Sequence, residues 1–474
     1  MVKDGNIPKT DAKSSDTKGS TDKLRETPKG ESKLPPRSMI KRAPGERAPL
    51  IDYKHPEPKP QHYENLILIS TEQLGRVTLH PEMLTYYHGF MTRDEAEFLL
   101  REHGDFLLRK TELGNQIKYV ISVLWENRSY HLLIHQTEKH KLYWIKKFAF
   151  HSASDLLEYH KKMKCPVHKN IVISNPIIKK FWQLYHTQIT FSAKVGEGQF
   201  GEVYVATFKK SAFVPTIRVA VKTLQSHMNN DARIEFLREA NLMLALSHAN
   251  VVKIYGVCTA KEPILIVMEF CDGSTLENII TSHKPCLEEK LYYIYGAAKG
   301  INYLHGQELV HRDIAARNCL INLERVVKVS DFGFSVKSKA KKEKKGGRLP
   351  MRYMAPETLK DFVYSQRSDV YSFGALIYEV LNDGAEPFCD YTGTAAQLRK
   401  DIINARVDLK LQDGHPEPLK VIFKRSRYYD PGRRSTTVEI VNWISTNYEH
   451  VNHDFKSLDC TGWTHIQPRK LETD

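Results

Sequence analysis

The stretch His311-Arg312-Asp313-Ile314-Ala315-Ala316-Arg317-Asn318 decides the fold of this chain. Asp331-Phe332-Gly333 follows it a short distance further along the sequence. Phosphoryl transfer needs a carboxylate that orients the attacking hydroxyl, and it needs oxygen ligands that hold Mg²⁺ against the phosphates. The spacing offers Asp313 for the first task, with Asn318 and Asp331 as the predicted metal ligands. The two motifs together therefore predict phosphoryl-transfer chemistry.

Both motifs resemble the catalytic loop and the metal-binding loop of protein kinases, and Ala355-Pro356-Glu357 follows in the order that a kinase requires. Serine/threonine kinases usually place a Lys two positions after the catalytic Asp, whereas Ala315 and Arg317 of this chain resemble the pattern of tyrosine kinases. The resemblance implies a bilobal fold that transfers the γ-phosphate of ATP to tyrosine in proteins, with Mg²⁺ or Mn²⁺ as cofactor. The residues predicted to be catalytic are Asp313, Arg317, Asn318, Lys222 and Glu239.

The segment from Gly196 to Val203 holds a G-x-G-x-x-G pattern and predicts a turn between two strands. That pattern alone would also fit the turn of a dinucleotide-binding βαβ unit. The strand 218–222 decides against the βαβ unit, because it ends in Lys222, placed like the lysine that holds the α- and β-phosphates in kinases. On the helix predicted next, Glu239 is expected to face Lys222, and Glu235 is expected at the surface.

The apolar segment 264–271 predicts a strand that leads into the connector between the two lobes. Met268 takes the gatekeeper position, which is also a core position, so that ordinary packing and the functional role are compatible. Adenine is expected to hydrogen-bond the backbone near Glu269 and Cys271. The predicted ATP-binding residues are Val195, Gly196, Glu197, Gly198, Gln199, Phe200, Gly201, Val203, Ala220, Lys222, Met268, Glu269 and Cys271.

The C-terminal half carries positions that resemble structural residues of the kinase fold. Asp369 is expected to brace the catalytic loop, and Glu357 is expected to pair with Arg434. Two positions depart from the family: Tyr353 replaces a Trp in the peptide-docking segment, and Ser426-Arg427 replaces Cys-Trp. These departures are expected to alter substrate preference and stability rather than the reaction class. The predicted structural set is His311, Arg312, Glu357, Asp369 and Arg434.

A second module is predicted upstream, where Thr92-Arg93-Asp94-Glu95 forms a capping box at the start of a helix. A strand follows and ends in Arg109. Such an Arg would ordinarily lie at a sheet edge with its head in water, but Arg93 and His131 give it two basic companions. The three residues resemble the pocket of an SH2 domain, in which the planar guanidinium of the strand Arg binds the phosphate of phosphotyrosine.

The residues after this strand depart from the usual SH2 sequence, because Lys110-Thr111 replaces Glu-Ser. Thr111 is expected to donate its hydroxyl to the phosphate, and Lys110 is expected to add local positive charge. Phosphotyrosine binding is therefore retained in the prediction, while the peptide preference stays open. The predicted phosphotyrosine-binding residues are Arg93, Arg109, Thr111 and His131.

The order of the modules narrows the resemblance. An SH2 domain followed by a tyrosine kinase domain, with the junction segments 171–178 and 182–184, resembles the Fes/Fer group of non-receptor tyrosine kinases. The resemblance implies an α+β multidomain fold. The SH2 domain is expected to have a central antiparallel sheet flanked by two helices, and the bilobal kinase fold follows it. The F-BAR domain of long members is not expected. The predicted domains are a disordered basic Pro/Ser/Lys-rich tail (1–80), an SH2 domain (84–178), a linker (179–188), a tyrosine kinase domain (189–448) and a C-terminal tail (449–474).

Composition predicts an intracellular protein. The chain has 474 residues, a formal net charge of +14 and 7 cysteines without a CxxC pair, which indicates reduced thiols rather than disulfides or a zinc framework. No secretory signal and no apolar run near the ~18 residues of a spanning helix are found, so a cytoplasmic location is predicted. The positive charge is expected to be solvated surface, without nucleic acid as a partner. Weak peripheral association of the basic tail with the inner face of the plasma membrane is the minor alternative.

Two functions of different class fit these motifs, namely an active tyrosine kinase and a phosphotyrosine-binding adapter whose kinase domain has lost activity. Inactive kinase domains usually lack the strand Lys, the catalytic Asp or the metal-binding Asp. This chain keeps all three, as Lys222, Asp313 and Asp331. We therefore favour catalysis on tyrosine-containing proteins, with the SH2 domain recruiting phosphotyrosine proteins or receptors.

The segment 334–352 holds no tyrosine, although kinases of this class commonly switch on when a Tyr in this segment is phosphorylated. A lysine-rich run from Lys337 to Lys345 occupies it instead. Such a run is usually a solvated face, and the alternative is a loop that grips acidic residues of a substrate or partner. Activity is therefore expected to depend mainly on docking of the SH2 domain on the N-lobe.

Overall fold

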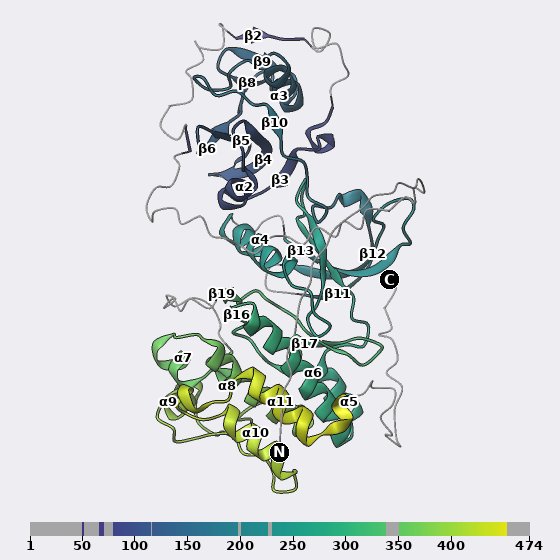
Figure 1. Ribbon diagram of the computed structural model, residues 1–474, viewed down its shortest axis with the longest axis vertical. Coiled ribbons are helices and arrows are strands. Elements are labelled where there is room, and N and C mark those ends of the chain that lie inside the picture. The colour runs from purple at the N-terminus through teal and green to yellow at the C-terminus, as the bar shows by residue number, and fades with distance from the viewer. Residues whose placement is uncertain are drawn as a thin grey trace, which may run out of the picture. The chain divides into compact units, whose positions relative to one another are not determined.

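A computed structural model of the chain describes residues 50–51, 66–70, 79–114, 116–197, 201–225, 230–337 and 350–452 (Figure 1). Most of the two predicted tails lies outside these residues. The described part contains two modules in chain order, the first built on an antiparallel central sheet and the second divided into two lobes. No helix within the described ranges has the length and apolar character needed to cross a bilayer.

The first module consists of a larger and a smaller sheet with two α-helices (Figure 1). Its elements are β1 (Leu50–Ile51), β2 (Ile67–Leu68), η2 (Pro81–Met83), β3 (Tyr87–Phe90), α2 (Arg93–Leu99), β4 (Asp105–Leu113), β5 (Gln116–Trp125), β6 (Arg128–Leu133), β7 (His135–Gln136), β8 (Tyr143–Ile145), β9 (Phe148–Phe150), α3 (Ala153–Lys162) and β10 (Asn175–Pro176). The larger sheet has the order β1-β6-β5-β4-β10, with β3 also paired to β4, and the smaller one has the order β2-β9-β8-β7. Strands β1 and β2 fall in the range predicted as tail.

The two faces of the larger sheet are covered by different helices, because side chains alternate along a strand. Leu107 of β4 packs with Ala96 of α2, whereas its neighbours Phe106 and Leu108 belong to the cluster that contains Leu156 of α3. The predicted sheet between two helices is thus confirmed, with antiparallel pairing among β4, β5 and β6 and parallel pairing of β1, β3 and β10 with them. The capping box predicted at the start of α2 also forms both of its hydrogen bonds.

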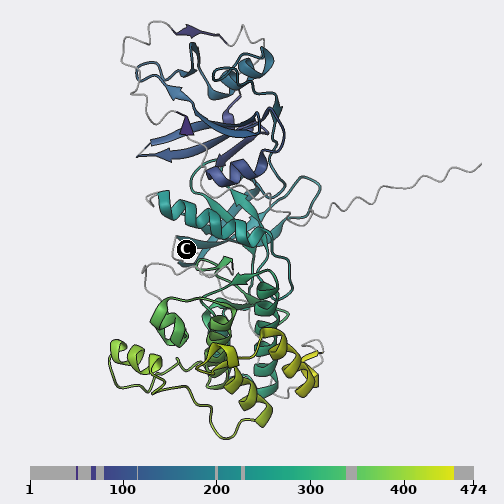
Figure 2. The same ribbon diagram turned by 60° about the vertical axis from the view of Figure 1, so that its left-hand side comes forward.

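The second module begins with a five-stranded sheet and a long helix, which form its N-lobe (Figure 2). The elements are η3 (His186–Gln188), β11 (Ile189–Glu197), β12 (Glu202–Phe208), β13 (Ile217–Thr223), α4 (Asn230–Leu244), β14 (Ile254–Cys258) and β15 (Leu265–Glu269). The antiparallel strands have the order β11-β12-β13-β15-β14. Phe236 and Met243 of α4 pack in one apolar cluster with Ile254 and Ile266 of this sheet.

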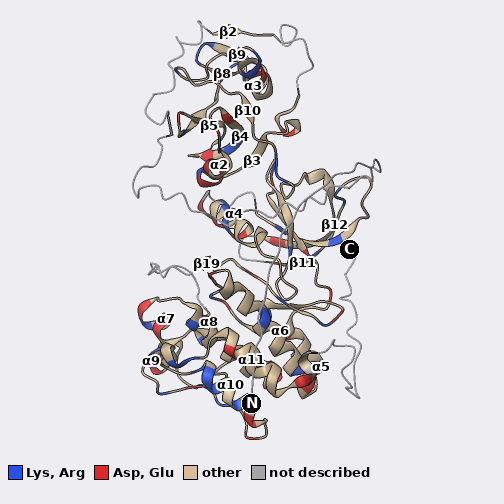
Figure 3. Cartoon of the chain, viewed as in Figure 1, with Lys and Arg blue, Asp and Glu red and all other residues tan. Residues whose placement is uncertain are grey.

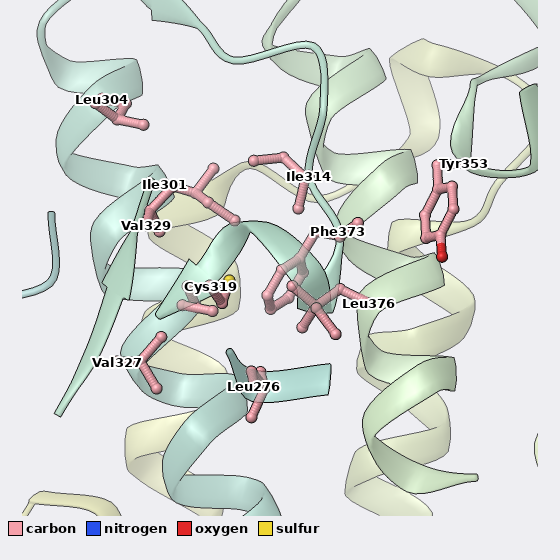
Figure 4. Packing of buried hydrophobic residues seen from close by; sticks show 14 of the residues in the cluster. Leu276, Ile301, Leu304, Ile314, Cys319, Val327, Val329, Tyr353, Phe373 and Leu376 are labelled. Atoms are coloured by element: carbon pink, nitrogen blue, oxygen red, sulfur yellow. The ribbon is translucent and has the colours of Figure 1, made fainter. Parts of the chain in front are cut away.

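The C-lobe is mostly helical. Its elements are α5 (Leu276–His283), α6 (Leu287–Gly306), β16 (Leu309–Val310), η4 (Ala316–Asn318), β17 (Cys319–Ile321), β18 (Val327–Val329), β19 (Val336–Lys337), η5 (Met351–Tyr353), α7 (Pro356–Asp361), α8 (Gln366–Leu381), α9 (Ala395–Ile403), α10 (Glu417–Ser426), η6 (Pro431–Arg433), α11 (Thr437–Asn447) and η7 (Glu449–Asn452). Figure 4 shows Ile314 of the catalytic loop and Cys319, the residue after the loop, packed among Ile301 of α6 and Phe373 and Leu376 of α8. The catalytic loop therefore rests on the core of this lobe.

Candidate active site

The backbone of the catalytic loop is bound by Asp369, a buried residue in the first turn of α8. Its carboxylate accepts the N–H of His311 at 2.7 Å and the N–H of Arg312 at 2.9 Å. Arg312 has a φ of +74°, a conformation that is unfavourable for residues other than glycine. The two charge-assisted hydrogen bonds offset this strain, and the three residues lie as their predicted structural roles require.

Asp313 is oriented by two residues of its own loop. The side-chain amide of Asn318 donates to Oδ2 and to the backbone oxygen of Asp313, both at 2.8 Å, and the guanidinium of Arg317 donates to Oδ1. Asp313 is 7% exposed. Its carboxylate therefore keeps one orientation and has a positive charge beside it, an arrangement that can align a hydroxyl and receive its proton.

The lysine predicted to bind phosphate and its predicted partner meet between β13 and α4. Nζ of Lys222 lies 2.8 Å and 3.0 Å from the two carboxylate oxygens of Glu239, and 3.9 Å from Oδ1 of Asp331. Glu235, one turn away on α4, is exposed as expected. Phe332 is buried, with its ring centroid 5.2 Å from that of His311. The strand lysine, the helix glutamate and the metal-binding loop are thus assembled together.

The sheet of the N-lobe positions the residues predicted to contact the nucleotide. In the strand register Val203 of β12 lies opposite Lys222, and Ala220 of β13 lies opposite Met268 of β15. Gly201 allows a close backbone approach, because a Cβ there would lie 2.1 Å from the carbonyl oxygen of Thr223. Val195, Gly196 and Glu197 end β11, whereas the predicted residues Gly198, Gln199 and Phe200 lie outside the described residues.

The connector between the lobes begins at the end of β15. The N–H of Glu269 donates to the carbonyl of Lys253 at 2.8 Å, and its carboxylate is paired with Lys328 at 2.7 Å. Burial raises the pKa of the Cys271 thiol to about 12, so that this residue is a neutral, half-buried side chain. The connector is thus held to Lys253, just before β14, and to Lys328 of β18, and its contact with adenine stays a prediction.

The kinase fold implies ATP and a divalent metal, and the donor set fits them. The amide nitrogen of Asn318 is turned toward Asp313, which leaves its Oδ1 as the available ligand atom. Asp331 has a half-exposed carboxylate close to Lys222. Oxygen ligands of this kind suit Mg²⁺ or Mn²⁺, and the ammonium of Lys222 suits phosphate.

The remaining structural residues also lie as predicted. Arg434 donates to both carboxylate oxygens of Glu357, at 2.6 Å and 2.8 Å, and is almost fully buried. The departure at Arg427 has a physical explanation. Its guanidinium lies 3.8 Å from the ring centroid of Tyr371 and donates to the hydroxyl of that residue at 2.8 Å and to Asp408 at 3.1 Å. A buried stack of Arg on Tyr thus fills a position where the family usually has Trp.

The SH2 pocket is built around Arg109, which is 2% exposed. Its Nε donates to Oγ of Ser122 at 2.9 Å, and its Nη1 donates to the carbonyl of Met91 at 3.1 Å. His131 lies directly opposite Ser122 in the β5–β6 register, with Nδ1 2.9 Å from the same hydroxyl, and its Nε2 lies 3.2 Å from Glu97. The short hairpin turn between Trp125 and Arg128 sets the register that pairs Ser122 with His131 and could have found Ser122, whereas Glu97 carries no sequence signal.

Electrostatics keep the pocket histidine neutral. Burial lowers the pKa of His131 to about 3, and the charges of Arg109 and Arg93 add to the effect. Thr111 follows Arg109 by two residues on β4 and therefore shares its side of the sheet. Lys110 lies on the opposite side, 5.4 Å from the ring centroid of Tyr119. The expectation that Lys110 adds charge to this pocket is therefore not met, because a strand turns successive side chains to opposite faces.

Comparison with known proteins identifies both modules. Residues 189–444 match the family described as protein tyrosine and serine/threonine kinase, and residues 86–160 match the SH2 domain. The chain is thus a protein kinase with an SH2 domain ahead of its kinase domain. This is the class that the two folds and their pockets define.

The relatives place the chain within that class. "Spermatocyte protein spe-8" of Caenorhabditis elegans is 48% identical over 383 residues, which are 80% of this chain and 74% of the relative. "Fer-related kinase 1" of the same organism is 34% identical over 371 residues, or 77% of this chain and 94% of the relative. "Tyrosine-protein kinase Fer" of Homo sapiens is 33% identical over 362 residues, or 75% of this chain and 43% of the relative. The chain belongs to the Fes/Fer-like SH2-containing tyrosine kinases, which confirms the resemblance seen in its motifs.

Proposed function

We propose that this chain is an active protein-tyrosine kinase that transfers the γ-phosphate of ATP to tyrosine side chains of proteins. The observation that carries the proposal is the assembly of two groups in one structure. Lys222 is paired with Glu239 in the N-lobe, and Asp313 is oriented by Arg317 and Asn318 in the C-lobe. A phosphotyrosine-binding adapter without activity would need neither group.

Each group has a separate task in the proposed reaction. The carboxylate of Asp313 aligns the tyrosine hydroxyl and receives its proton, while Arg317 balances the charge of that carboxylate. Lys222 holds the α- and β-phosphates, and Glu239 keeps its ammonium in place. A divalent metal held by Asn318 and Asp331 would neutralise charge on the phosphates.

The proposal is tested with Mg²⁺-ATP and a tyrosine-containing polymer. The wild-type chain is expected to incorporate phosphate on tyrosine, and Asp313→Asn is expected to lower kcat by about 10²–10⁴-fold, the range typical of general-base removal. Binding of a phosphotyrosine peptide should stay unchanged, because it involves a separate module. A wild-type chain that binds the peptide but transfers no phosphate would favour the adapter instead.

We further propose that the SH2 domain binds phosphotyrosine through Arg109, with Arg93, Thr111 and His131 around the phosphate. The buried guanidinium with its fixed Nε supports this role. Arg109→Leu should lower the affinity for a phosphopeptide by at least tenfold, since a charged hydrogen bond contributes ~1.5–3 kcal/mol. Unchanged affinity in calorimetry would contradict the assignment. The partners proposed from this site are phosphotyrosine proteins or receptors.

The SH2 domain is also proposed to hold the kinase domain in its active arrangement. Phe90 donates its N–H to the carbonyl of Thr259 at 2.8 Å, and its side chain belongs to the apolar cluster of the kinase domain. Tyr87 donates its hydroxyl to the carbonyl of Ala260 at 2.8 Å. Gly89 permits this approach, because a Cβ there would meet the carbonyl oxygen of Thr259 at 2.0 Å. The two modules therefore dock through backbone as well as side chains.

A second contact reaches α4, the helix that carries Glu239. Helix α2 is rich in acidic residues (Figure 3), and its Glu95 accepts a hydrogen bond from the side chain of Asn241 on α4. Arg233, also on α4, pairs with Glu112 of β4 and with Glu262 of the kinase domain. These contacts support an orientation of α4 that presents Glu239 to Lys222.

The domain boundaries and the location are proposed from the same data. β10 ends the SH2 sheet at Pro176 and β11 begins the kinase sheet at Ile189, which supports boundaries of 84–178 and 189–448 with a linker between them. A kinase that consumes ATP and reads phosphotyrosine is proposed to work in the cytoplasm. Recruitment to the plasma membrane through the basic tail would be tested by sedimentation with anionic vesicles.

A further inference from the structure

Tyr353 occupies an unusual place between the peptide-docking segment and the catalytic loop. It ends η5 and is 6% exposed. Its hydroxyl donates to Oε1 of Glu379 at 2.7 Å, and its backbone carbonyl accepts a hydrogen bond from Ser372 at 2.8 Å. Figure 4 shows the tyrosine at the edge of the C-lobe core beside α8, the helix that carries Glu379 and Ser372. Both ends of the residue are thus fixed to one helix.

Glu379 connects this tyrosine to the catalytic loop. Its second carboxylate oxygen accepts the N–H of Ala316 at 3.0 Å, and the side chain is 2% exposed. A carboxylate buried to this degree is costly unless its oxygens are hydrogen-bonded. Tyr353 supplies one donor and the catalytic loop supplies the other. The position of Ala316 is therefore coupled to the presence of the tyrosine hydroxyl.

The ring of Tyr353 reaches the same loop by a second route. The guanidinium of Arg317 lies 4.8 Å from the centroid of the ring, within the range of a cation–π contact. The same guanidinium donates to Oδ1 of Asp313. Arg317 is one-third exposed, so that without the ring its side chain would have more freedom to leave the carboxylate. Ring and hydroxyl thus act on neighbouring residues of one loop.

We propose that Tyr353 and Glu379 form a positioning pair, which holds Arg317 against Asp313 and links the peptide-docking segment to the catalytic carboxylate. The inference rests on the proposed kinase function and deepens it. The pair acts on the alignment of the reacting hydroxyl, and it lies apart from Lys222 and Glu239, which serve the nucleotide. Its loss should therefore lower kcat and leave the KM for ATP unchanged.

Two substitutions distinguish the contribution of the Tyr353 hydroxyl from the contribution of its ring. Tyr353→Phe keeps the ring and should lower kcat about fivefold, the factor that corresponds to the ~1 kcal/mol of one hydrogen bond. Tyr353→Leu removes the ring as well and should lower kcat roughly 50-fold, because the cation–π contact is also lost. Tyr293→Phe is the matched control, since Tyr293 is a buried tyrosine on α6 that donates its hydroxyl to a different carboxylate, that of Glu289. That control should retain wild-type kcat.

A double-mutant cycle distinguishes positioning from a general loss of structure. If the ring acts through Arg317, then Tyr353→Leu should cost much less in an Arg317→Ala background than in the wild type. Equal losses in both backgrounds would overturn the proposal, and so would wild-type kcat in Tyr353→Leu. A raised KM for ATP without a change in kcat would also contradict it.

Hydrogen exchange provides a readout that does not depend on activity. Tyr353→Phe and Tyr353→Leu should accelerate amide exchange in the segment 316–318, while Tyr293→Phe should leave it unchanged. If the wild type transfers no phosphate but these exchange rates still rise, the kinase function fails and the positioning pair stands. Unchanged exchange in both variants would overturn the positioning pair itself.

Discussion

Three carboxylates in the kinase domain, two of them buried and that of Glu357 partly exposed, are balanced in different ways. Glu239 contacts the ammonium of Lys222, and Glu357 contacts the guanidinium of Arg434 through both oxygens. Glu379 instead accepts hydrogen bonds from neutral groups, the hydroxyl of Tyr353 and a backbone N–H. Burial raises the pKa of Glu379 to about 7, against the opposing effect of those hydrogen bonds. The ionised form of Glu379 is therefore disfavoured by its buried environment.

The raised pKa of Glu379 predicts that the free energy of unfolding depends on pH. The folded state keeps a proton on Glu379 up to about pH 7, whereas the unfolded chain releases it near the ordinary value of 4.5. The stabilisation is thus complete below that ordinary value and is lost as the pH rises through the folded pKa, by about 3 kcal/mol in total. The side chain in Glu379→Gln cannot titrate. The difference in free energy of unfolding, variant minus wild type, should therefore increase as the pH rises. Urea unfolding at several pH values measures this increase.

The groups around Glu379 and a control define the test. Tyr353, Arg317, Glu277 and Cys319 are the titratable or charged residues that face this carboxylate from neighbouring elements. The wild type and the variant share all of them, so the difference between their pH profiles isolates the glutamate. Glu417→Gln, at an exposed position of α10, should give the wild-type profile. A constant difference between Glu379→Gln and the wild type would show that the carboxylate does not titrate in this range.

Arg427 occupies a position where the family usually has Trp, and it makes different contacts there. The ring of Tyr371 lies between two guanidinium groups, with Arg427 at 3.8 Å and Arg434 at 4.9 Å from its centroid. Arg427 is 3% exposed, and a Cβ at Gly374 would lie 2.5 Å from its Cδ. The stem of this Arg therefore packs against Gly374, and its Nε and Nη2 donate to Asp408 and to the hydroxyl of Tyr371, whereas its buried Nη1 has no hydrogen-bond partner among the described residues.

Truncation at this position should destabilise the C-lobe. We expect Arg427→Ala to lower the free energy of unfolding by roughly 2–4 kcal/mol, because a cavity forms and the stack on Tyr371 is lost. Chemical denaturation of both variants checks this, with exposed Arg425→Ala as the control on the same helix, for which a change below ~1 kcal/mol is expected. Equal small losses for the two variants would mean that the buried stack contributes little.

At the scale of elements, sequence spacing predicted the contacts that lie within a motif. The catalytic loop and the pair Lys222–Glu239 are where their motifs placed them, since each motif fixes both the element and the face that carries the residue. Contacts between elements far apart in sequence were predicted only where both residues lie in kinase motifs, as for Glu357 with Arg434. Glu112 and Arg233 are separated by 121 positions, and neither lies in a motif, so their pairing depends on how the SH2 domain docks. Glu379 was missed for a similar reason, as one buried residue in a helix of apolar pattern.

Docking of the SH2 domain on the kinase domain is expected to control the position of α4. Arg233→Met keeps much of the apolar stem but removes the charge that pairs with Glu112 and Glu262. We expect several-fold lower kcat with wild-type affinity for a phosphopeptide, because α4 would hold Glu239 less firmly while the SH2 pocket is intact. Steady-state kinetics and calorimetry on the full chain measure both quantities. Glu235→Gln, at an exposed position of α4, is the control. Lower activity in that variant as well would show that α4 is sensitive to any substitution, rather than to loss of the contacts with the SH2 domain.

At the scale of the whole molecule, the phosphotyrosine pocket and the docked surface share a short segment. Arg109 donates to the carbonyl of Met91, and the next residue toward the N-terminus, Phe90, is packed in the kinase cluster. Helix α2 makes a second link, since Glu97 contacts the pocket histidine and Glu95 contacts Asn241 of α4. A phosphopeptide in the pocket therefore favours the docked arrangement, provided that the peptide binds the docked arrangement more tightly than the undocked arrangement.

The segment between Asp331-Phe332-Gly333 and Ala355-Pro356-Glu357 offers only Tyr353 for the usual phosphorylation switch. No tyrosine occurs between residues 334 and 352, and Tyr353, the next one, is buried with its hydroxyl bound to Glu379. The lysine-rich run from Lys337 to Lys345, expected to be a solvated face with binding of acidic groups as the alternative, lies outside the described residues except for Lys337. Control of activity is therefore expected to come from the SH2 domain rather than from phosphorylation in this segment.

This expectation is tested on the purified chain before and after treatment with a tyrosine phosphatase. Activity should change little on dephosphorylation, because no latch tyrosine is present, and it should rise several-fold when a phosphatase-resistant phosphopeptide occupies the SH2 pocket. The same peptide should have no effect on Arg109→Leu, which cannot bind it, nor on Arg233→Met, in which the path to α4 is broken. A large loss of activity on dephosphorylation together with no response to the peptide would assign control to a phosphorylated tyrosine instead. A response that persists in Arg233→Met would leave the SH2 domain as the switch, but it would route the signal through the contacts of Tyr87 and Phe90 with the N-lobe.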